Sequence, residues 1–366
     1  MPITVTALRE TAAGERRVAI TPEMAKKLRG KGLRVLLEHD AGTRAGFPDT
    51  SYVDVEFTDA GQVLAQADLL ACVLPPDDAA LSRLREGALL VGQLRPYAAA
   101  ARIALLAQHK LTAFSLELLP RTTRAQAMDV LSSQAAVAGY RAMLIAAEAA
   151  PKFFPMLTTA AGTIRPSKVL VIGAGVAGLQ AIATARRLGA QTEGYDVRPE
   201  TREQVESLGA KFLDLGVSAA GSGGYARELS AEERAAQQQA LAEHLKTVDV
   251  IVTTAAVPGR PAPKILTAAM VQGLKPGTLI VDLAAEGGGN CELTRPGERV
   301  EQGGVTILGP LNLPAGAPLH ASEMYARNVY NFVELLVRED GLRPDFDDEL
   351  IAKSCLAHAG EIRWQP

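Results

Sequence analysis

Residues 168–178 read Lys-Val-Leu-Val-Ile-Gly-Ala-Gly-Val-Ala-Gly, and this stretch decides the fold of the chain. Its apolar run predicts a buried strand, and the segment 179–188 that follows Gly-x-Gly-x-x-Gly has the pattern of a helix. Gly173 permits the tight turn from strand to helix, Gly175 lets the backbone come close to a pyrophosphate, and Gly178 lets the helix pack closely on the strand. The stretch therefore predicts the strand–turn–helix unit of a doubly wound α/β fold.

A second predicted strand, residues 191–195, is followed by Asp196, 18 positions after the last glycine of the turn. A carboxylate at this place accepts hydrogen bonds from the ribose hydroxyls of an adenosine. The free N–H groups at the start of the helix favour a pyrophosphate. Together with the glycine spacing, these features predict a dinucleotide site. Because the Asp196 carboxylate would repel a 2′-phosphate, the site is expected to take NAD(H) and not NADP(H).

Size and composition indicate a globular protein with two domains. The chain has 366 residues, of which 48% are hydrophobic and 22% are charged. The net charge of −3 and the pI near 6.0 indicate no basic surface for nucleic acid or anionic lipid. Three scattered cysteines favour a reducing cytoplasm over a disulfide framework, and no spacing of Cys and His predicts a metal site.

The sequence predicts no membrane-spanning segment. The first residues, Met-Pro-Ile-Thr-Val-Thr, lack the pattern of a secretory signal. The longest apolar stretch, 135–150, is interrupted by Arg141 and Glu148, so it falls short of the ~18–20 apolar residues that cross a bilayer.

Two Rossmann-like doubly wound domains are expected, separated by a cleft and bridged by long helices. The first comprises residues 1–130 together with 320–366, where short apolar runs alternate with helical segments, one of which begins at Pro22. A mainly parallel sheet is expected there, with strands at 3–8, 34–38, 69–74, 88–92 and 111–116. The second domain, residues 131–319, contains the glycine turn, with strands at 168–172, 191–196, 248–253, 278–283 and 305–309.

Further segments connect or extend these domains. A long helix over 125–149 is expected to bridge to the second domain, and a helix over 321–338 to cross back to the first. The tail, 353–364, has the pattern of a hairpin around Ala359-Gly360. Segment 216–226 is rich in glycine and serine and holds one aromatic residue, so it is either a lid over a ligand or a disordered surface connection.

A second candidate functional segment, residues 120–134, is dense in polar side chains. Arg121, Gln126, Asp129 and Ser132 are candidates to face the cleft, and steps of three place the last three on one helical face. Such groups offer donors and acceptors to a carboxamide. The alternative is helix capping with a solvated surface, which the segment by itself favours.

These motifs resemble the alanine dehydrogenase/transhydrogenase family, and within it the NAD(H)-binding component of the proton-translocating nicotinamide nucleotide transhydrogenases. The resemblance covers essentially the whole chain. The Arg…Gln…Asp segment and Gly223-Gly-Tyr-Ala226 are specific to the transhydrogenases, whereas alanine dehydrogenases share the glycine turn and the N-terminal motif. The matching stretches are 16–22, 120–133, 173–180, 196–198, 223–226 and 253–259.

The resemblance implies a role for the residues of both candidate segments. Asp129 and Ser132 would bind the nicotinamide carboxamide, and Arg121 would contact the nucleotide nearby. Gln126 would reach toward the nucleotide of a partner, so that Arg121, Gln126 and Asp129 form the catalytic set. The residues that would line the pyrophosphate and adenosine site, or close over it, are Val176, Asp196, Val197, Arg198, Gly224, Tyr225 and Ala255.

The resemblance also implies an assembly. One dinucleotide motif holds one nucleotide, so NADP(H) would be bound by a partner beta subunit, and hydride would pass directly between the two nicotinamides. A membrane-spanning subunit would couple this transfer to proton translocation. The chain would then lie at the cytoplasmic face of the plasma membrane, attached through its partners and not inserted. A homodimer is expected from the family.

Two alternative functions make different demands on the sequence. An alanine dehydrogenase needs a cationic anchor for its substrate carboxylate and a proton shuttle, and the corresponding places hold Cys72 and Arg95. A thiol cannot replace an ammonium group, and an arginine that stays charged cannot shuttle a proton. A non-catalytic NAD-binding protein would not need polar groups that fix the nicotinamide ring. A transhydrogenase component therefore fits the residues best.

Overall fold

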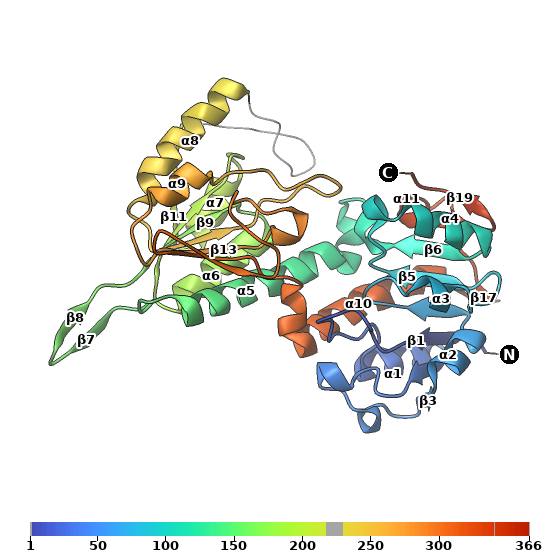
Figure 1. Cartoon of the computed structure of the whole chain (residues 1–366). Coiled ribbons are helices and arrows are strands. Elements are labelled where there is room, and N and C mark those ends of the chain that lie inside the picture. Colours follow the sequence, from blue (N-terminus) through green and yellow to red (C-terminus); the bar gives the residue numbers. More distant parts are fainter. Residues whose placement is uncertain (1, 217–229, 340, 366) are drawn as a thin grey trace. The chain divides into compact units, whose positions relative to one another are not determined.

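The computed structural model describes residues 2–216, 230–339 and 341–365, and the chain divides into two compact units (Figure 1). Unit 1 comprises Met1–Gln134 and Pro314–Pro366, and unit 2 comprises Ala135–Leu313. The division between residues 134 and 135 falls inside helix α5 (Val130–Ala149). Each unit contains its own sheet and its own buried core.

The sheet of unit 1 has the strand order β3-β2-β1-β4-β5-β6-β18-β19 among the residues described. Strands β1 to β6 are parallel, and β18 and β19 continue the sheet in antiparallel pairing. The bounds are β1 Thr4–Ala7, β2 Arg34–Glu38, β3 Glu56–Thr58, β4 Leu69–Ala71, β5 Leu89–Gly92, β6 Thr112–Ser115, β18 Cys355–His358 and β19 Glu361–Ile362. The first six strands follow the order 3-2-1-4-5-6 of a doubly wound fold.

Both faces of this sheet are buried, because consecutive strand residues point to opposite sides. Leu69 and Leu89 join a core with α1 (Pro22–Gly30) and α10 (Pro318–Leu336), whereas Leu70 and Leu90 join a second core with the helices of the other face. Those helices are α2 Ala60–Gln66, α3 Asp78–Leu81 and α4 Ala100–Gln108. The unit also contains α11 Glu349–Ser354, several short 3-10 helices, and the small pair β16 Val337–Arg338 and β17 Gly341–Leu342.

The sheet of unit 2 has the order β11-β10-β9-β12-β13-β15-β14 within the described residues. All its pairs are parallel except β14 with β15, so the six parallel strands again follow the order 3-2-1-4-5-6. The bounds are β9 Lys168–Ile172, β10 Gln191–Tyr195, β11 Lys211–Phe212, β12 Val250–Thr253, β13 Leu279–Asp282, β14 Arg299–Gln302 and β15 Val305–Leu308. A doubly wound α/β class is thus confirmed for both units.

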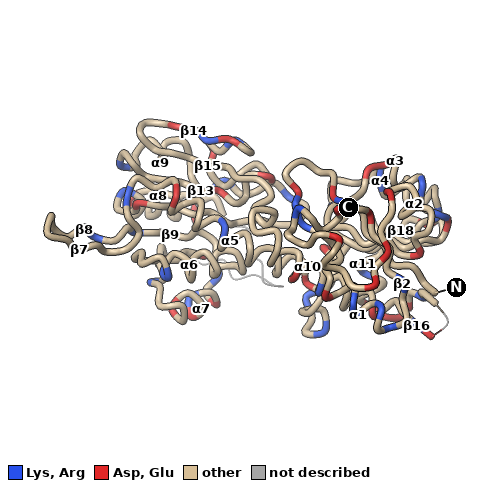
Figure 2. Tube along the Cα trace, turned by 90° about the horizontal axis from the view of Figure 1, so that it is seen from below, with Lys and Arg blue, Asp and Glu red and all other residues tan. Residues whose placement is uncertain are grey.

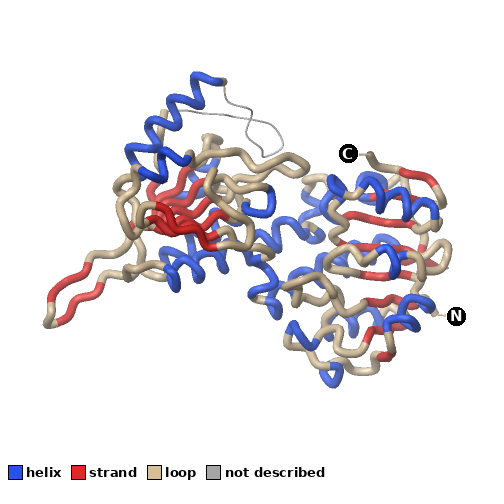
Figure 3. Tube along the Cα trace, viewed as in Figure 1, coloured by secondary structure: helices blue, strands red, loops and turns tan. Residues whose placement is uncertain are grey.

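Helices cover both faces of the second sheet as well (Figure 3). Helices α5, α6 (Val176–Arg187) and α7 (Thr201–Ser207) bury apolar residues against one face, and α8 (Ala231–Leu245) and α9 (Ala268–Gln272) against the other. A two-stranded hairpin, β7 Leu157–Thr159 and β8 Gly162–Ile164, projects away from the body of the unit (Figure 1).

Among the described residues, one helix, α5, is long and apolar enough to cross a membrane, judged by its length and composition alone. Ala142, Met143 and Ala146 of this helix are completely buried in the core of unit 2. An apolar helix with a face packed on a sheet is typical of a globular interior, and Arg141 and Glu148 interrupt its sequence. We therefore interpret α5 as a core helix.

Most predicted elements are confirmed, and the differences have local causes. The helix expected from residue 125 begins only at Val130, because residues 123–128 form a 3-10 helix and Asp129 has an extended backbone with ψ 92°. The prediction that Gln126, Asp129 and Ser132 share one helical face was therefore wrong. The tail hairpin is present around Ala359-Gly360, but its first strand begins at Cys355 because α11 precedes it. Strands β3, β7, β8, β11, β14, β16 and β17 were not predicted; they are short or exposed. The helix expected over 321–338 ends at Leu336, and Val337–Arg338 form β16.

Charged residues of both signs are mixed along both units (Figure 2). Within the described ranges, no group of three or more His, Cys, Asp and Glu residues is arranged to hold a metal ion. The cysteines at positions 72, 291 and 355 are free thiols and are buried.

Candidate nucleotide-binding site

The strand ends of unit 2 gather the residues of the predicted nucleotide site. Ile172 of β9 pairs in register with Tyr195 of β10 and with Thr253 of β12. The residues that follow these three strands therefore lie at one edge of the sheet. Strands β10 and β12 lie on opposite sides of β9, and such a reversal of strand order is where doubly wound sheets bind their ligands.

The glycine turn has the geometry that its sequence predicts. Gly173 has φ 100°, its N–H donates to the Tyr195 carbonyl at 2.8 Å, and a Cβ on it would lie 2.5 Å from Thr254 Oγ1. A Cβ on Gly178 would overlap the Gly173 carbonyl, so the helix approaches the turn too closely for any side chain there. Both positions therefore require glycine for the packing of β9 against α6.

Gly175 differs from the other two glycines because nothing lies within 4 Å of the place where its Cβ would be. It is the N-cap of α6 and provides no side-chain acceptor, and the following residue, Val176, is 44% exposed. The first amides of the helix are therefore accessible together with the positive end of the helix dipole. A glycine facing open space at this helix end fits the close approach of a pyrophosphate.

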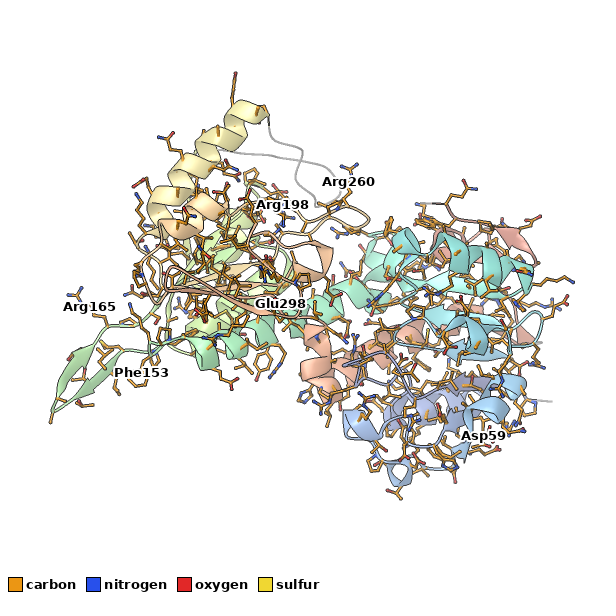
Figure 4. All side chains as sticks on the ribbon, in the orientation of Figure 1. Asp59, Phe153, Arg165, Arg198, Arg260 and Glu298 are labelled. Atoms are coloured by element: carbon orange, nitrogen blue, oxygen red, sulfur yellow. The ribbon has the colours of Figure 1, made fainter. Side chains whose placement is uncertain are left out.

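Asp196 lies directly after β10 and is buried, with 9% of its surface exposed. Its Oδ2 accepts from the Ala174 N–H of the glycine turn at 2.7 Å. The Arg198 side chain donates to the same carboxylate, from Nε to Oδ1 at 2.9 Å and from Nη2 to Oδ2 at 2.8 Å. The Arg198 N–H donates to Oδ1 at 2.9 Å. The acid is thus tied to the glycine turn and paired with an arginine, marked in Figure 4.

Thr254 and Ala255, which follow β12, complete this edge of unit 2. Thr254 Oγ1 donates to the Gly173 carbonyl at 2.9 Å. The completely buried Asn290 holds the backbone of Ala255 in both directions, accepting from its N–H at 3.0 Å and donating to its carbonyl at 2.8 Å. The role of Asn290 was not predicted, because nothing in the sequence around it indicates a contact with Ala255. Val197 is half-buried and packs on the adjacent core.

The loop with Gly224 and Tyr225, predicted to be a lid or a surface connection, lies outside the described residues.

The polar segment of unit 1 has two kinds of environment. Arg121 and Gln126 are exposed, the latter on the 3-10 helix 123–128. Asp129 caps α5, because its carboxylate accepts from the Ser132 N–H at 2.9 Å and from Ser132 Oγ at 2.6 Å. Asp129 and Ser132 are thus in contact, but with capping geometry and not as neighbours on one helical face.

The N-terminal motif of unit 1 contains a buried polar cluster that was not predicted from the sequence. Arg17 donates from Nε to Glu15 Oε1 at 2.8 Å, from Nη2 to Glu15 Oε2 at 2.6 Å, and from Nη1 to Gln134 Oε1 at 2.8 Å. Gln134 in turn donates to the Ala321 carbonyl at 3.1 Å. Arg17 is 4% exposed and joins the start of α5 to α10, so it holds structure and is not available to a small carboxylate.

The corresponding edge of the sheet in unit 1 holds an acid in place of a glycine turn. Glu10, after β1, accepts from the Val73 N–H at 2.6 Å and from the Leu74 N–H at 3.3 Å, both after β4. Burial is the main cause that raises the pKa of Glu10 to about 7. Glu10 thus occupies these amides, and the described residues of unit 1 show no glycine turn like that of unit 2.

Cys72 and Arg95 stand where an alanine dehydrogenase needs a cationic anchor and a proton shuttle, and their surroundings do not suit either role. Cys72 is buried, and desolvation raises the pKa of its thiol well above the usual value. The Arg95 N–H donates to the carboxylate of Glu117, which also accepts from the Leu94 N–H at 2.7 Å. Neither residue places an ammonium group or a titrating imidazole at this edge.

Comparisons with known proteins agree with this geometry. The family descriptions "Alanine dehydrogenase/PNT, N-terminal domain" and "Alanine dehydrogenase/PNT, C-terminal domain" match residues 6–138 and 142–365. The chain is 43% identical to the first portion of the divided NAD(P) transhydrogenase subunit alpha of Rhodospirillum rubrum, covering 97% of this chain and 96% of that one. The crystal structure of a transhydrogenase from Sinorhizobium meliloti matches with a TM-score of 0.90 at 42% identity, over 98% of this chain and 99% of that one.

Alanine dehydrogenases are more distant. The enzyme of Mycolicibacterium smegmatis is 26% identical over 96% of this chain and 92% of its own length. Together the two family descriptions cover the chain almost from end to end, and the 43% identity is to a transhydrogenase subunit. The chain belongs to the alanine dehydrogenase/PNT family, on the branch of the NAD(P) transhydrogenase alpha subunits.

Proposed function

We propose that this chain is the NAD(H)-binding component of a proton-translocating NAD(P) transhydrogenase. The observation that carries the proposal is the glycine turn of unit 2, where Gly175 leaves the end of α6 open and Asp196 follows the next strand. The 43% identity to a transhydrogenase alpha subunit over 97% of the chain supports the same assignment.

In this proposal, residues of each candidate segment are assigned to NAD(H). The pyrophosphate meets the amides at the start of α6, and the adenosine meets Asp196, Val197 and Arg198. The nicotinamide carboxamide is bound by Asp129 and Ser132, with Arg121 nearby. The Ser132 hydroxyl already donates to Asp129, so its oxygen remains an acceptor for the carboxamide N–H groups.

The chain contributes orientation and not covalent chemistry. The nicotinamide supplies the hydride, and the protein must hold its C4 atom facing that of the second nucleotide with water excluded. Gln126 is exposed on the 3-10 helix 123–128, in a segment separate from the glycine turn of unit 2. We assign it to the nucleotide of the partner, with Arg121 and Asp129 completing the catalytic set.

NADP(H) is assigned to a partner beta subunit, and proton translocation to a membrane-spanning subunit. The transfer is direct and specific for one face of each nicotinamide. The chain is active only in this assembly, and its partners hold it at the cytoplasmic face of the plasma membrane.

The proposed assembly includes a second copy of this chain, and the β7–β8 hairpin supports it. Every residue from 155 to 165 is exposed, including Met156 at 65%, Leu157 at 40% and Ile164 at 46%. Phe153, marked in Figure 4, is 55% exposed at the base of the hairpin. An isolated two-stranded hairpin has little stability in water, and exposed apolar side chains on it are typical of an interface.

Calorimetric titration of NADH into the wild type and the Gly175→Val variant tests the nucleotide site. The Cβ of the new side chain meets no atom in the protein, so folding is preserved, but the side chain occupies the approach of the pyrophosphate. We expect NADH affinity to fall about tenfold or more. Gly30→Ala is the matched control, since Gly30 also faces open space and lies in α1 of unit 1. Unchanged affinity in Gly175→Val would contradict the proposed site.

A further inference from the structure

The carboxylate of Asp196 is held by several hydrogen bonds within its own loop and the glycine turn. Its two oxygens accept four hydrogen bonds, from the Ala174 N–H, the Arg198 N–H, Arg198 Nε and Arg198 Nη2. Two of these four hydrogen bonds come from one guanidinium, so the acid and the arginine form one paired unit at the place predicted for the ribose.

Arg198 is held at a fixed place beside the glycine turn. Its carbonyl accepts from Thr201 Oγ1 at 2.7 Å and from the Thr201 N–H at 3.2 Å, which anchors the loop to the first turn of α7. Its side chain is 17% exposed, and that of Asp196 is 6% exposed. The guanidinium thus stays close to the ribose position predicted for the adenosine, with its charge neutralised by Asp196.

Asp196 and Arg198 are residue types that favour different nucleotides in dinucleotide sites. An acid at the end of the second strand accepts from the ribose 2′-hydroxyl, whereas an arginine nearby accommodates a 2′-phosphate. An arginine matches phosphate geometry with two parallel hydrogen bonds. Here both residues belong to one loop, two positions apart, and the acid occupies the hydrogen-bonding edge of the arginine.

We propose that Arg198 is a preformed receptor for a 2′-phosphate that Asp196 holds closed. The Asp196 charge then has two effects, since it repels the phosphate and also occupies the group that would bind it. Removal of this one charge breaks the pairing with the guanidinium and shifts the preference of the site toward NADP(H). The inference rests on the proposed nucleotide site of unit 2 and deepens it.

The test uses Asp196→Asn in the full chain, with binding measured by calorimetry. The amide oxygen of Asn takes the place of Oδ2 and still accepts from the Ala174 N–H, so the glycine turn stays supported. Its N–H₂ takes the place of Oδ1, so Arg198 Nε and the Arg198 N–H lose their acceptor and the guanidinium loses its counter-charge. The probes are 2′,5′-ADP and 5′-AMP, which differ in the 2′-phosphate, followed by NADPH and NADH. We expect affinity for 2′,5′-ADP and NADPH to rise about tenfold or more, with a fall for NADH.

Two double variants separate Arg198 from a general change in charge. Asp196→Asn with Arg198→Ala should lose the gain for 2′,5′-ADP. Asp196→Asn with Arg202→Ala should keep it, because Arg202 pairs with Asp214 on the neighbouring surface and has its contacts away from Asp196. Circular dichroism of each variant checks that unit 2 is folded.

The outcomes also separate this inference from the proposed function. A folded Asp196→Asn variant that gains nothing for 2′,5′-ADP, or a gain that survives Arg198→Ala, would overturn the receptor. A wild-type chain that binds neither 5′-AMP nor NADH would instead refute the nucleotide site itself. Tighter binding of 2′,5′-ADP that depends on Arg198 would establish the receptor.

Discussion

Gln126 and Asp129 show how much a single residue's surroundings decide its role. Asp129 is committed to the protein, because its carboxylate caps α5 through two hydrogen bonds to Ser132. Gln126 is exposed, and its backbone carbonyl accepts from the Asp129 N–H at 3.4 Å. Replacement of Asp129 is therefore expected to change stability as well as any binding, whereas replacement of Gln126 tests the proposed contact with the partner's nucleotide alone.

Gln126→Asn should lower hydride transfer in the assembly while NADH affinity for this chain is preserved. The side chain becomes one methylene shorter, and a small misplacement of reacting groups costs on the order of 10²-fold in rate. Gln108→Asn, at the exposed end of α4, is the matched control and should have the wild-type rate. Single-turnover transfer and NADH calorimetry on the same preparations give the comparison. A wild-type rate in Gln126→Asn would leave this residue as ordinary surface.

Glu10 makes a prediction about pH. Burial raises the folded-state pKa of Glu10 to about 7 from an ordinary 4.5, so the folded protein binds a proton more tightly than the unfolded chain. Its contribution to stability is complete below pH 4.5 and is lost as the pH rises through 7. The thermal midpoint of the wild type should therefore fall between about pH 5 and pH 8 by more than that of Glu10→Gln. If the thermal midpoints of the two proteins changed with pH in the same way, the pKa of Glu10 would not be raised in the folded protein.

At the scale of elements, the strand–turn–helix units were predictable and their exceptions were not. The sequence predicts β9, α6 and β10 because apolar runs, glycine spacing and helix length agree with one another. It does not predict that α5 begins only at Val130, since the choice between 3-10 helix and α-helix at 123–128 depends on contacts with α10. The backbone carbonyl of Ala127, for example, accepts from both Asn328 and Asn331.

The same limit applies to the residues of the site. Gly173, Gly175, Gly178 and Asp196 follow from a local motif, and the structure brings them to one edge of the sheet. The pairing of Asp196 with Arg198 and the support of Ala255 by Asn290 depend on side-chain geometry that no spacing encodes. The sequence therefore indicates the candidate residues, and the structure is needed to show which of their polar groups are already hydrogen-bonded.

The β7–β8 hairpin carries the element-scale prediction. Leu157 and Ile164 face each other across its strands and are exposed. Replacement of both by Asp should shift the chain from dimer to monomer in sedimentation velocity, because two charges would be buried in the proposed interface. Thr158→Asp together with Thr163→Asp is the control on the other face of the same pair of strands. A double Asp variant at 157 and 164 that remains dimeric would place the interface elsewhere.

For the whole molecule, one doubly wound fold occurs twice and only one copy has a candidate nucleotide site among the described residues. Both sheets have the strand order 3-2-1-4-5-6, yet the edge of unit 1 is taken by Glu10 and that of unit 2 is open at Gly175. The matched family domains meet between residues 138 and 142, whereas residues 314–366 return to unit 1 through α10 and β18. With one such candidate site in the described part of the chain, the proposed hydride transfer requires a second, NADP(H)-binding subunit.

The central claim is that hydride passes directly from NADH on this chain to NADP⁺ on a partner. The most direct measurement mixes the chain with the NADP(H)-binding subunit, supplies NADH with deuterium at one or the other C4 position, and follows the label by mass spectrometry. We expect deuterium from one of the two positions to appear in NADPH, and Gly175→Val to suppress this transfer. NADPH that forms without deuterium from either position, or no NADPH at all, would contradict it.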